Sequence, residues 1–345
     1  MDTLTLARWK ASTARLADAM REAARTELLR ARASGDFSRV ARPVAVGAGD
    51  LTYGIDAPTE EVLTRWLLEQ ARHGPLSLLT EDAGWRHFGP GPAGPGELPG
   101  FDHGGPRIVV DPIDGTRNLM TDLRSAWSVI ALCGPGKGEP RQSDVVHGLL
   151  SEIPTSRAGS WLRLCADKGG ACEFEEFALH TGQSARGPRT LRADADDRVD
   201  HGYFPFFKYM ADMRVMIGEV ETRFLARLEQ HERADVRNCY DDQYISNAGQ
   251  LVCLITGQYR MIAELRAHLA ERRGRATLTT KPYDIAGALL CAEAAGCVIT
   301  DALGAPLDFP LDARTPVSFV GWHNSATQRR LRPHLDAALG GPSGA

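Results

Sequence analysis

Residues 110–116 read Val-Asp-Pro-Ile-Asp-Gly-Thr, which places two carboxylates three positions apart at the end of an apolar strand predicted at 107–110. The proline fixes the turn between the acids, and the Gly-Thr pair begins the next segment with N–H groups that can hold an anion. Two carboxylates this close raise one another's pKa unless a cation lies between them. Because hard divalent ions bind carboxylate and carbonyl oxygens, Asp111, Asp114 and the Ile113 carbonyl suit Mg²⁺. The alternative interpretation is a polar turn, since Asp, Pro and Gly are the usual turn residues.

Two further acids weaken the polar-turn interpretation. Glu81 follows an apolar strand predicted at 76–80, and Glu forms turns less readily than Asp or Asn. Asp284 stands at the beginning of a very apolar helix predicted at 284–295, where helix capping is an equally simple explanation. Turn formation and capping explain each acid alone but not all four together, so the four acids as a set weaken the polar-turn interpretation.

Hydrophobic periodicity predicts an N-terminal half rich in antiparallel strands. The expected elements are helices at 3–33 and 58–72 and strands at 76–80, 107–110, 126–133, 144–152 and 160–166. The later strands have the spacing of an antiparallel meander. Residues 89–100 are rich in Gly and Pro and are expected to form a surface loop, whereas the polar, non-periodic residues 182–200 mark a boundary between halves.

The remainder of the chain alternates helix and strand, which predicts an α/β layer with a partly parallel sheet. The expected elements are helices at 207–230, 246–257, 259–273, 284–295 and 324–339 and strands at 234–238, 296–300 and 317–321. We therefore divide the chain into an N-terminal α+β half at 1–190, which carries Glu81 and the 110–116 motif, and a C-terminal α/β half at 191–345, which carries Asp284.

Length and charge exclude several classes of protein. A chain of 345 residues allows two domains or one large one. Its 40 basic and 44 acidic residues give a net charge of −4, too balanced for a protein that binds nucleic-acid polymers or membrane surfaces. No apolar run is long enough to span a membrane, and the N-terminal residues lack the apolar core of a secretory signal, so a cytoplasmic location is expected. The seven cysteines are odd in number and include no C-x-x-C pair.

Two long motifs resemble those of one enzyme superfamily. The sequence DPIDGTRNL (111–119) resembles the D-P-[IL]-D-G-[ST]-x-N-[FY] motif of the inositol monophosphatase and fructose-1,6-bisphosphatase superfamily of lithium-sensitive, Mg²⁺-dependent phosphatases. The segment KPYDIAGALLCAEAAG (281–296) is similar to its second signature, and Asp56 and Glu81 match two single acids of the family. The resemblance spans residues 50–325. The segments YDDQYIS (240–246) and KPYD (281–284) resemble those of a poorly characterised bacterial branch of the superfamily.

The resemblance implies a layered αβαβα sandwich and a site with two or three Mg²⁺ ions, for which Mn²⁺ could substitute. It implies that one metal is bound by Glu81, Asp111 and the Ile113 carbonyl, and the second by Asp111, Asp114 and Asp284. The implied catalytic residues, which activate the attacking water, are Thr116, Asp56 and Glu81. The implied substrate-binding residues are Gly115, Thr116, Asp114, Arg117 and Lys281. A homodimer acting on a small phosphorylated metabolite is also implied.

Departures from the motifs leave the substrate open. In the family, an acid seven positions before the last metal-binding Asp contacts the substrate, and Thr277 occupies that position here. The Trp that directly precedes the same Asp in the family is replaced by Tyr283. We therefore expect residues 205–280 to determine specificity. The candidate substrate is a small phosphorylated metabolite, such as an inositol-phosphate-like compound or a sugar phosphate. The alternative is 3′(2′),5′-bisphosphate nucleotidase or fructose-1,6-bisphosphatase-like activity. A non-catalytic protein that binds a phosphorylated metabolite is a minor alternative. Arg237 and Arg275 are further candidate phosphate contacts. A haloacid dehalogenase is disfavoured, because its D-x-D spacing differs from that of Asp111 and Asp114.

Overall fold

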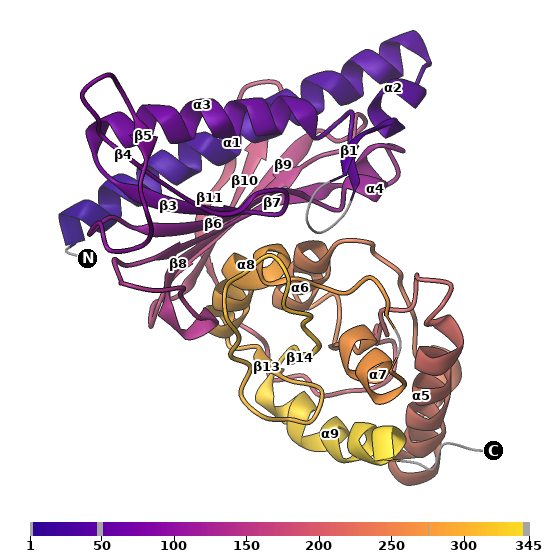
Figure 1. Ribbon diagram of the computed structural model, residues 1–345. Helices are drawn as coiled ribbons and strands as arrows, with labels where there is room; N and C mark the ends of the chain where they lie inside the picture. The colour runs from indigo at the N-terminus through magenta and orange to yellow at the C-terminus, as the bar shows by residue number, and fades with distance from the viewer. Residues whose placement is uncertain (1–2, 47–50, 275, 341–345) are drawn as a thin grey trace.

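The computed structural model describes residues 3–46, 51–274 and 276–340. Layers of helix and sheet alternate in Figure 1: helices α1 (Thr3–Ser34) and α3 (Ala57–His73), a nine-stranded sheet, helices α6 (Asn247–Ile255) and α8 (Pro282–Ala295), a three-stranded sheet, and helices α5 (Arg214–Arg227) and α9 (Ser325–Gly340). Helix α7 (Arg266–Arg272) packs beside α5. This arrangement confirms the expected αβαβα sandwich. Among the described helices, none has the length and apolar character needed to cross a membrane.

The nine-stranded sheet contains the N-terminal acids. Its strands, in spatial order, are β11 (Ser184–Leu191), β10 (Cys172–Ala178), β9 (Ser160–Asp167), β8 (Val145–Ile153), β7 (Ala126–Cys133), β6 (Arg107–Asp114), β3 (Leu76–Thr80), β4 (Gly84–Gly89) and β5 (Gly96–Glu97). Strands β3 and β6 run parallel, and the other neighbours are antiparallel. The parallel pair brings the ends of β3 and β6, and with them Glu81 and the 110–116 motif, to the same edge.

The apolar side chains of β6 alternate between two hydrophobic cores, one on each face of the sheet. Ile108 and Val110 pack in the core formed with α1 and α3, whereas Val109 packs in the core formed with α6 and α8. Successive side chains of a strand point to opposite faces, so a continuous apolar run indicates a strand buried on both sides. The prediction of a buried strand at 107–110 is confirmed, although the strand continues to Asp114.

The second sheet differs from the prediction. Its order is β12 (Met261–Glu264), β14 (Phe319–Trp322) and β13 (Val298–Thr300), and both pairs are antiparallel, so the prediction of a partly parallel sheet is wrong. The helix predicted at 259–273 is strand β12 followed by α7. The strand predicted at 234–238 contains a 3₁₀ turn at Val236–Asn238. Short apolar runs fit helix and strand equally well, which accounts for these errors.

Three segment boundaries also differ from the prediction. The loop predicted at 89–100 includes strand β5, and the non-periodic segment 182–200 contains β11. Strand β11 is an exposed edge held by backbone pairing with β10, so it carries no alternation of apolar residues. The helix predicted at 207–230 begins only at Arg214 and ends in a π turn at Leu228–Glu232. The smaller elements are helices α2 (Ser38–Ala41) and α4 (Thr116–Leu119), a 3₁₀ turn at Gln142–Asp144, and the hairpin of β1 (Pro43–Val46) and β2 (Leu51–Tyr53).

Two glycines bring helix α8 into backbone contact with the large sheet. A Cβ atom on Gly287 of α8 would lie 2.3 Å from the carbonyl oxygen of Ile130, and one on Gly148 of β8 would lie 2.3 Å from the carbonyl oxygen of Gly287. Both distances are far inside van der Waals contact, so neither position accepts a side chain without movement of the backbone. The close approach fixes the position of α8, which carries Asp284.

We expect Gly287→Ala to reduce the free energy of unfolding by about 1–3 kcal/mol, because the added methyl group overpacks this contact. Gly218→Ala is the matched control, since Gly218 lies within helix α5 and no neighbouring atom lies within 4 Å of the place that its methyl group would take. There, the higher helix propensity of Ala should stabilise the protein by up to about 1 kcal/mol. Urea unfolding of both variants measures the difference. Equal stability of the two would contradict the packing argument.

Candidate metal centre

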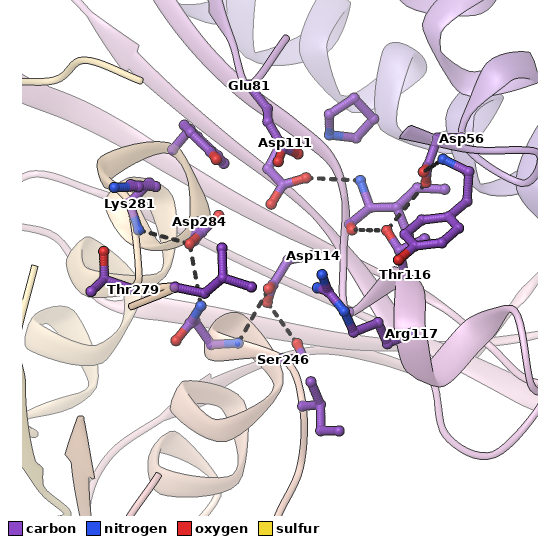
Figure 2. Close-up of a pocket in the computed structure, with 18 of the residues that line it drawn as sticks. Asp56, Glu81, Asp111, Asp114, Thr116, Arg117, Ser246, Thr279, Lys281 and Asp284 are labelled. Atoms are coloured by element: carbon purple, nitrogen blue, oxygen red, sulfur yellow. Dashed lines mark hydrogen bonds between the residues drawn. The ribbon is translucent and has the colours of Figure 1, made fainter. Parts of the chain in front are cut away.

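Three acids from distant parts of the chain meet in one cavity. One carboxylate oxygen from each of Asp111, Asp114 and Asp284 lies within 4.8 Å of the others. Asp111 and Asp114 come from the end of β6 and Asp284 from the first turn of α8, and Figure 2 shows the three side chains converging. The cavity has a volume of about 300 Å³ and is also lined by Glu81. The structure thus brings together the residues that the sequence analysis grouped.

An irregularity in β6 directs both of its acids into the cavity. The pairing of β6 with β7 shifts register between Asp111 and Asp114. One carboxylate oxygen of Asp111 accepts a hydrogen bond of 3.0 Å from the Ile113 backbone N–H, which holds the turn. A break in the ladder re-aims side chains that regular alternation would send to opposite faces, so the Asp-Pro-Ile-Asp sequence is a strand distortion.

The beginning of helix α6 holds Asp114. The Ser246 hydroxyl and the Ala248 N–H each donate to Oδ2 of Asp114 at 2.6 Å, and the Asn247 N–H donates to Oδ1 at 3.2 Å. Backbone N–H groups in the first turn of a helix have no partner within the helix, so a carboxylate placed there is stabilised. The sequence analysis missed these residues, although a Ser before an apolar helix is a recognisable capping signal.

Asp284 lies within the first turn of α8, three residues after Lys281, and its carboxylate receives two hydrogen bonds on one oxygen. Oδ2 of Asp284 accepts from the Lys281 backbone N–H at 2.8 Å and from the Asn247 side-chain amide at 3.3 Å. Pro282 occupies the start of the helix, where a missing N–H costs nothing. Helix capping therefore explains the position of Asp284 only in part, since the side chain also faces two other buried acids.

The metal-free carboxylates are electrostatically frustrated. Burial, and then repulsion by Asp284, Asp114 and Glu81, raises the pKa of Asp111 well above its usual range. Burial and then repulsion by Asp114 does the same for the pKa of Asp284. Burial also raises the pKa of Asp114 to about 6, in spite of its hydrogen bonds to α6. Clustered hard oxygen donors that repel one another are the ligand set that a divalent cation requires, so the residues present fit Mg²⁺ or Mn²⁺.

The residues predicted to activate water lie beside this cluster. The Thr116 hydroxyl lies 3.1 Å from Oδ1 of Asp56 and 3.0 Å from the Ile113 carbonyl oxygen (Figure 2). Burial raises the pKa of Asp56 to about 6. Glu81 follows β3, and its carboxylate lies beside that of Asp111 in Figure 2, but it is not one of the three acids whose oxygens lie within 4.8 Å. The geometry thus pairs Thr116 with Asp56 and places Glu81 at the edge of the cluster.

Gly115 allows the chain to turn into helix α4 at the cavity wall. Its φ of 100° lies in the left-handed region, and a Cβ there would lie 3.0 Å from Cβ of Ser246 and 3.2 Å from the Ile245 carbonyl oxygen. Both the conformation and the space therefore favour glycine. The N–H groups of Gly115 and Thr116 consequently lie next to the three acids, where they can contact an anion held by a metal ion.

The predicted cationic contacts have different environments. The Arg117 side chain extends toward Asp114 in Figure 2. The ammonium group of Lys281 instead donates to the Arg314 carbonyl oxygen at 2.9 Å, while its backbone N–H holds Asp284. Arg237 is exposed and paired with Asp235, and it is not among the residues lining the cavity. Arg275 lies outside the described residues.

The residues that line the rest of the cavity were only partly foreseen. Thr277 lines the cavity, as does the neighbouring Leu278. The sequence analysis did not single out Phe207, Tyr209 and Arg266, which line the same cavity. The guanidinium of Arg266 lies 4.5 Å from the ring centroid of Phe207 and 5.0 Å from that of Tyr209. Because these residues belong to segments far apart in sequence, no local pattern indicates their meeting.

The metal-free protein should lose stability as the pH rises above about 4 and passes through the folded-state pKa of Asp114, about 6. The folded-state pKa values of Asp111 and Asp114 exceed the unfolded value of 3.8, so the folded state binds more protons within this window, and ionisation then costs stability. Asp111→Asn removes one repelling charge, so its melting temperature in chelator should fall less between pH 4 and 7 than that of the wild type. Excess Mg²⁺ should abolish the fall in the wild type.

Asp102→Asn is the control for the pH experiment, since Asp102 is a surface carboxylate with 74% of its side chain exposed. Its melting curve should follow the wild type at every pH. If Asp111→Asn were clearly less stable than the wild type in chelator at pH 7, Asp111 would have a chiefly structural role.

No family model and no curated protein matches this sequence. Several solved structures do match it. An inositol monophosphatase–fructose 1,6-bisphosphatase gene product matches with a TM-score of 0.63 at 15% identity, over 96% of this chain and 99% of its own. Fructose-1,6-bisphosphatase of Leishmania major matches with a TM-score of 0.64 at 12% identity, over 96% and 99%. Inositol monophosphatase-II of Staphylococcus aureus matches with a TM-score of 0.52 at 18% identity, over 94% and 95%. The chain has the fold of the inositol monophosphatase and fructose-1,6-bisphosphatase structures.

Proposed function

We propose that this protein is an Mg²⁺-dependent phosphomonoesterase of the inositol monophosphatase and fructose-1,6-bisphosphatase superfamily, which hydrolyses a small phosphorylated metabolite. The observation that carries the proposal is the convergence of Asp111, Asp114 and Asp284 within 4.8 Å, beside the N–H groups of Gly115 and Thr116. The fold supports it, because the same architecture occurs in the phosphatase structures described above.

Each metal-binding residue has a definite place in this proposal. Glu81, Asp111 and the Ile113 carbonyl would hold one ion, and Asp111, Asp114 and Asp284 would hold the second; Glu81 could help to hold a third. Bound divalent ions supply a nucleophile at neutral pH and stabilise the charge on the leaving oxygen. The acids need no covalent role, so the reaction proceeds without a phosphoenzyme. Mn²⁺ would serve in place of Mg²⁺, and Li⁺ would inhibit.

Thr116 and Asp56 would orient the attacking water. A hydroxyl group has one proton, so Thr116 donates either to Asp56 or to the Ile113 carbonyl, at 3.1 and 3.0 Å. When the Ile113 carbonyl is engaged by a metal ion, donation to Asp56 is favoured. The Thr116 oxygen would then accept a hydrogen bond from the water, and a proton that leaves the water would pass through Thr116 to Asp56, which holds the Thr116 proton by a hydrogen bond. Glu81, which lies beside Asp111, would act on the same water.

The phosphate and its leaving group would face different walls. The phosphate would contact the N–H groups of Gly115 and Thr116 and the side chain of Arg117. Asp114 would lie next to the phosphate. Lys281 would act mainly through its backbone, because its ammonium group is engaged by Arg314. The leaving group would meet the wall that contains Tyr209 and Thr277. We further propose that 1–190 and 191–345 form two halves of one catalytic unit and that the chain forms a homodimer, which light scattering in solution would test.

We expect hydrolysis of phosphomonoesters with Mg²⁺ or Mn²⁺, inhibition by Li⁺ and complete loss of turnover in excess chelator. Phosphate release should be measured over inositol phosphates, sugar phosphates and bisphosphates, histidinol phosphate and 3′-phosphoadenosine nucleotides. Because Thr277 replaces an acid, inositol monophosphate should not be the best substrate by a wide margin. Turnover that persists in chelator would refute the proposed chemistry, and the absence of turnover on every ester would favour a binding protein. The preferred ester would decide among monophosphatase, nucleotidase and bisphosphatase activity.

We expect Thr116→Ala to lower kcat about a hundredfold, the scale of a lost proton-transfer partner, with little change in KM. Thr116→Ser should recover most of the activity, because it restores the hydroxyl. Thr121→Ala is the matched control: its hydroxyl lies 3.1 Å from the carbonyl oxygens of both Arg117 and Asn118, at the end of the same helical turn and away from the acids. Steady-state kinetics on the best ester measure the effect. Equal kcat values for the two alanine variants would rule out this role for Thr116.

A further inference from the structure

Asn247 connects two of the clustered acids that come from different elements of the fold. Its backbone N–H donates to Oδ1 of Asp114 at 3.2 Å, and its side-chain amide donates to Oδ2 of Asp284 at 3.3 Å. The residue is the first of helix α6 and is buried, with 8% of its surface exposed. A single residue therefore contacts one acid from β6 and one from α8, which Figure 2 shows facing one another.

The neighbours of Asn247 determine which way its amide points. Arg266 donates to the Thr280 hydroxyl oxygen at 3.2 Å, and Thr280 donates to Oδ1 of Asn247 at 2.7 Å. A guanidinium has no acceptor and a carboxylate only accepts. Thr280 therefore accepts from Arg266 and donates to Asn247. Asp284 in turn receives a hydrogen bond from Asn247. The carbonyl of the Asn247 side chain therefore faces Thr280, and its NH₂ group faces Asp284. The direction of these hydrogen bonds therefore determines the orientation of the Asn247 side-chain amide.

The far end of this chain of hydrogen bonds is immobilised. Arg266 and Glu264 form a buried ion pair at 2.9 Å, and the side chain of each is only 2% exposed. Arg266 also donates to the Tyr209 hydroxyl and the Leu278 carbonyl, both at 3.0 Å. A buried, fully hydrogen-bonded guanidinium has little freedom to rotate, so it holds Thr280 and, through it, Asn247.

We propose that Asn247 is a positioning residue for the metal centre, which determines the oxygen that Asp284 presents to the other acids. Asn247 and the Lys281 N–H both occupy Oδ2 of Asp284, so Oδ1 remains for the cation. Partners that orient a ligating carboxylate affect metal affinity without touching the ion. Thr280 is linked to Asp284 through the Asn247 side-chain amide. The inference rests on the metal ion of the proposed function, but not on turnover.

The test is Mn²⁺ binding to the full-length metal-free protein, measured by the electron paramagnetic resonance signal of free Mn²⁺. Asn247→Ala should weaken binding about tenfold, the scale of a lost partner to a metal ligand. Thr280→Val keeps the shape of the side chain but removes the hydroxyl, and it should weaken binding in the same direction. Thr280→Ser restores the hydroxyl and should restore the affinity. Melting in chelator, measured in parallel, reports folding separately from binding.

Asn324→Ala is the matched control. Asn324 is 6% exposed, and its side chain also makes two hydrogen bonds, with the Asp196 carbonyl and the Thr327 N–H, far from the acids. It should melt at a lower temperature yet bind Mn²⁺ as the wild type does. Wild-type Mn²⁺ affinity in folded Asn247→Ala, or equal weakening by Thr280→Val and Thr280→Ser, would overturn the proposal. If Asn247→Ala does not fold, wild-type affinity in Thr280→Val overturns it.

The two proposals fail separately in these experiments. Weaker Mn²⁺ binding by Asn247→Ala, in a protein that hydrolyses none of the esters, would support the positioning role and refute the phosphatase. Ester hydrolysis with unaltered Mn²⁺ affinity in the Asn247 and Thr280 variants would support the phosphatase and refute the positioning role.

Discussion

Repulsion among buried carboxylates is the constraint on which the rest of the site depends. Asp111, Asp114 and Asp284 place oxygens within 4.8 Å of one another in a region where burial alone raises their pKa values. Such a cluster tends to move apart unless the surrounding structure resists. The strand distortion in β6, the first turn of α6 and the glycine contact of α8 each supply part of that resistance. The unfavourable electrostatics are thereby retained in the metal-free protein.

The resisting elements act on different atoms of the acids. Donors from α6 occupy both oxygens of Asp114, whereas the donors to Asp284 share a single oxygen. Asp111 is held by the N–H of its own turn. The three carboxylates thus have different freedom to meet an ion, although their residue types are the same. This difference is not visible from the spacing of acids in the sequence.

The sequence predicts what local patterns encode. The periodicity of α1 and α8 extends over several turns, and both helices form where they were expected. The acids of the 110–116 motif and Asp284 meet as anticipated, because their positions at the ends of apolar elements place them at one edge. The run at 261–264 was misassigned, since a run of only four residues satisfies either period. Asn247, Tyr209 and Arg266 were missed because their roles depend on contacts between segments that only the folded chain brings together.

The contact between Gly148 and Gly287 has a consequence for ion size. Side-chain packing can yield by a few tenths of an ångström, but the separation of α8 from the sheet is set by main-chain atoms on both sides. Asp284 therefore has a nearly invariant distance from the acids of β6. Mg²⁺ and Ca²⁺ differ in their ligand distances by roughly 0.3–0.5 Å and in the number of oxygens they bind. With a metal ion bound as proposed, a rigid spacing of this kind would discriminate between ions by radius, and the two glycines, which do not line the cavity, would contribute to its choice of metal.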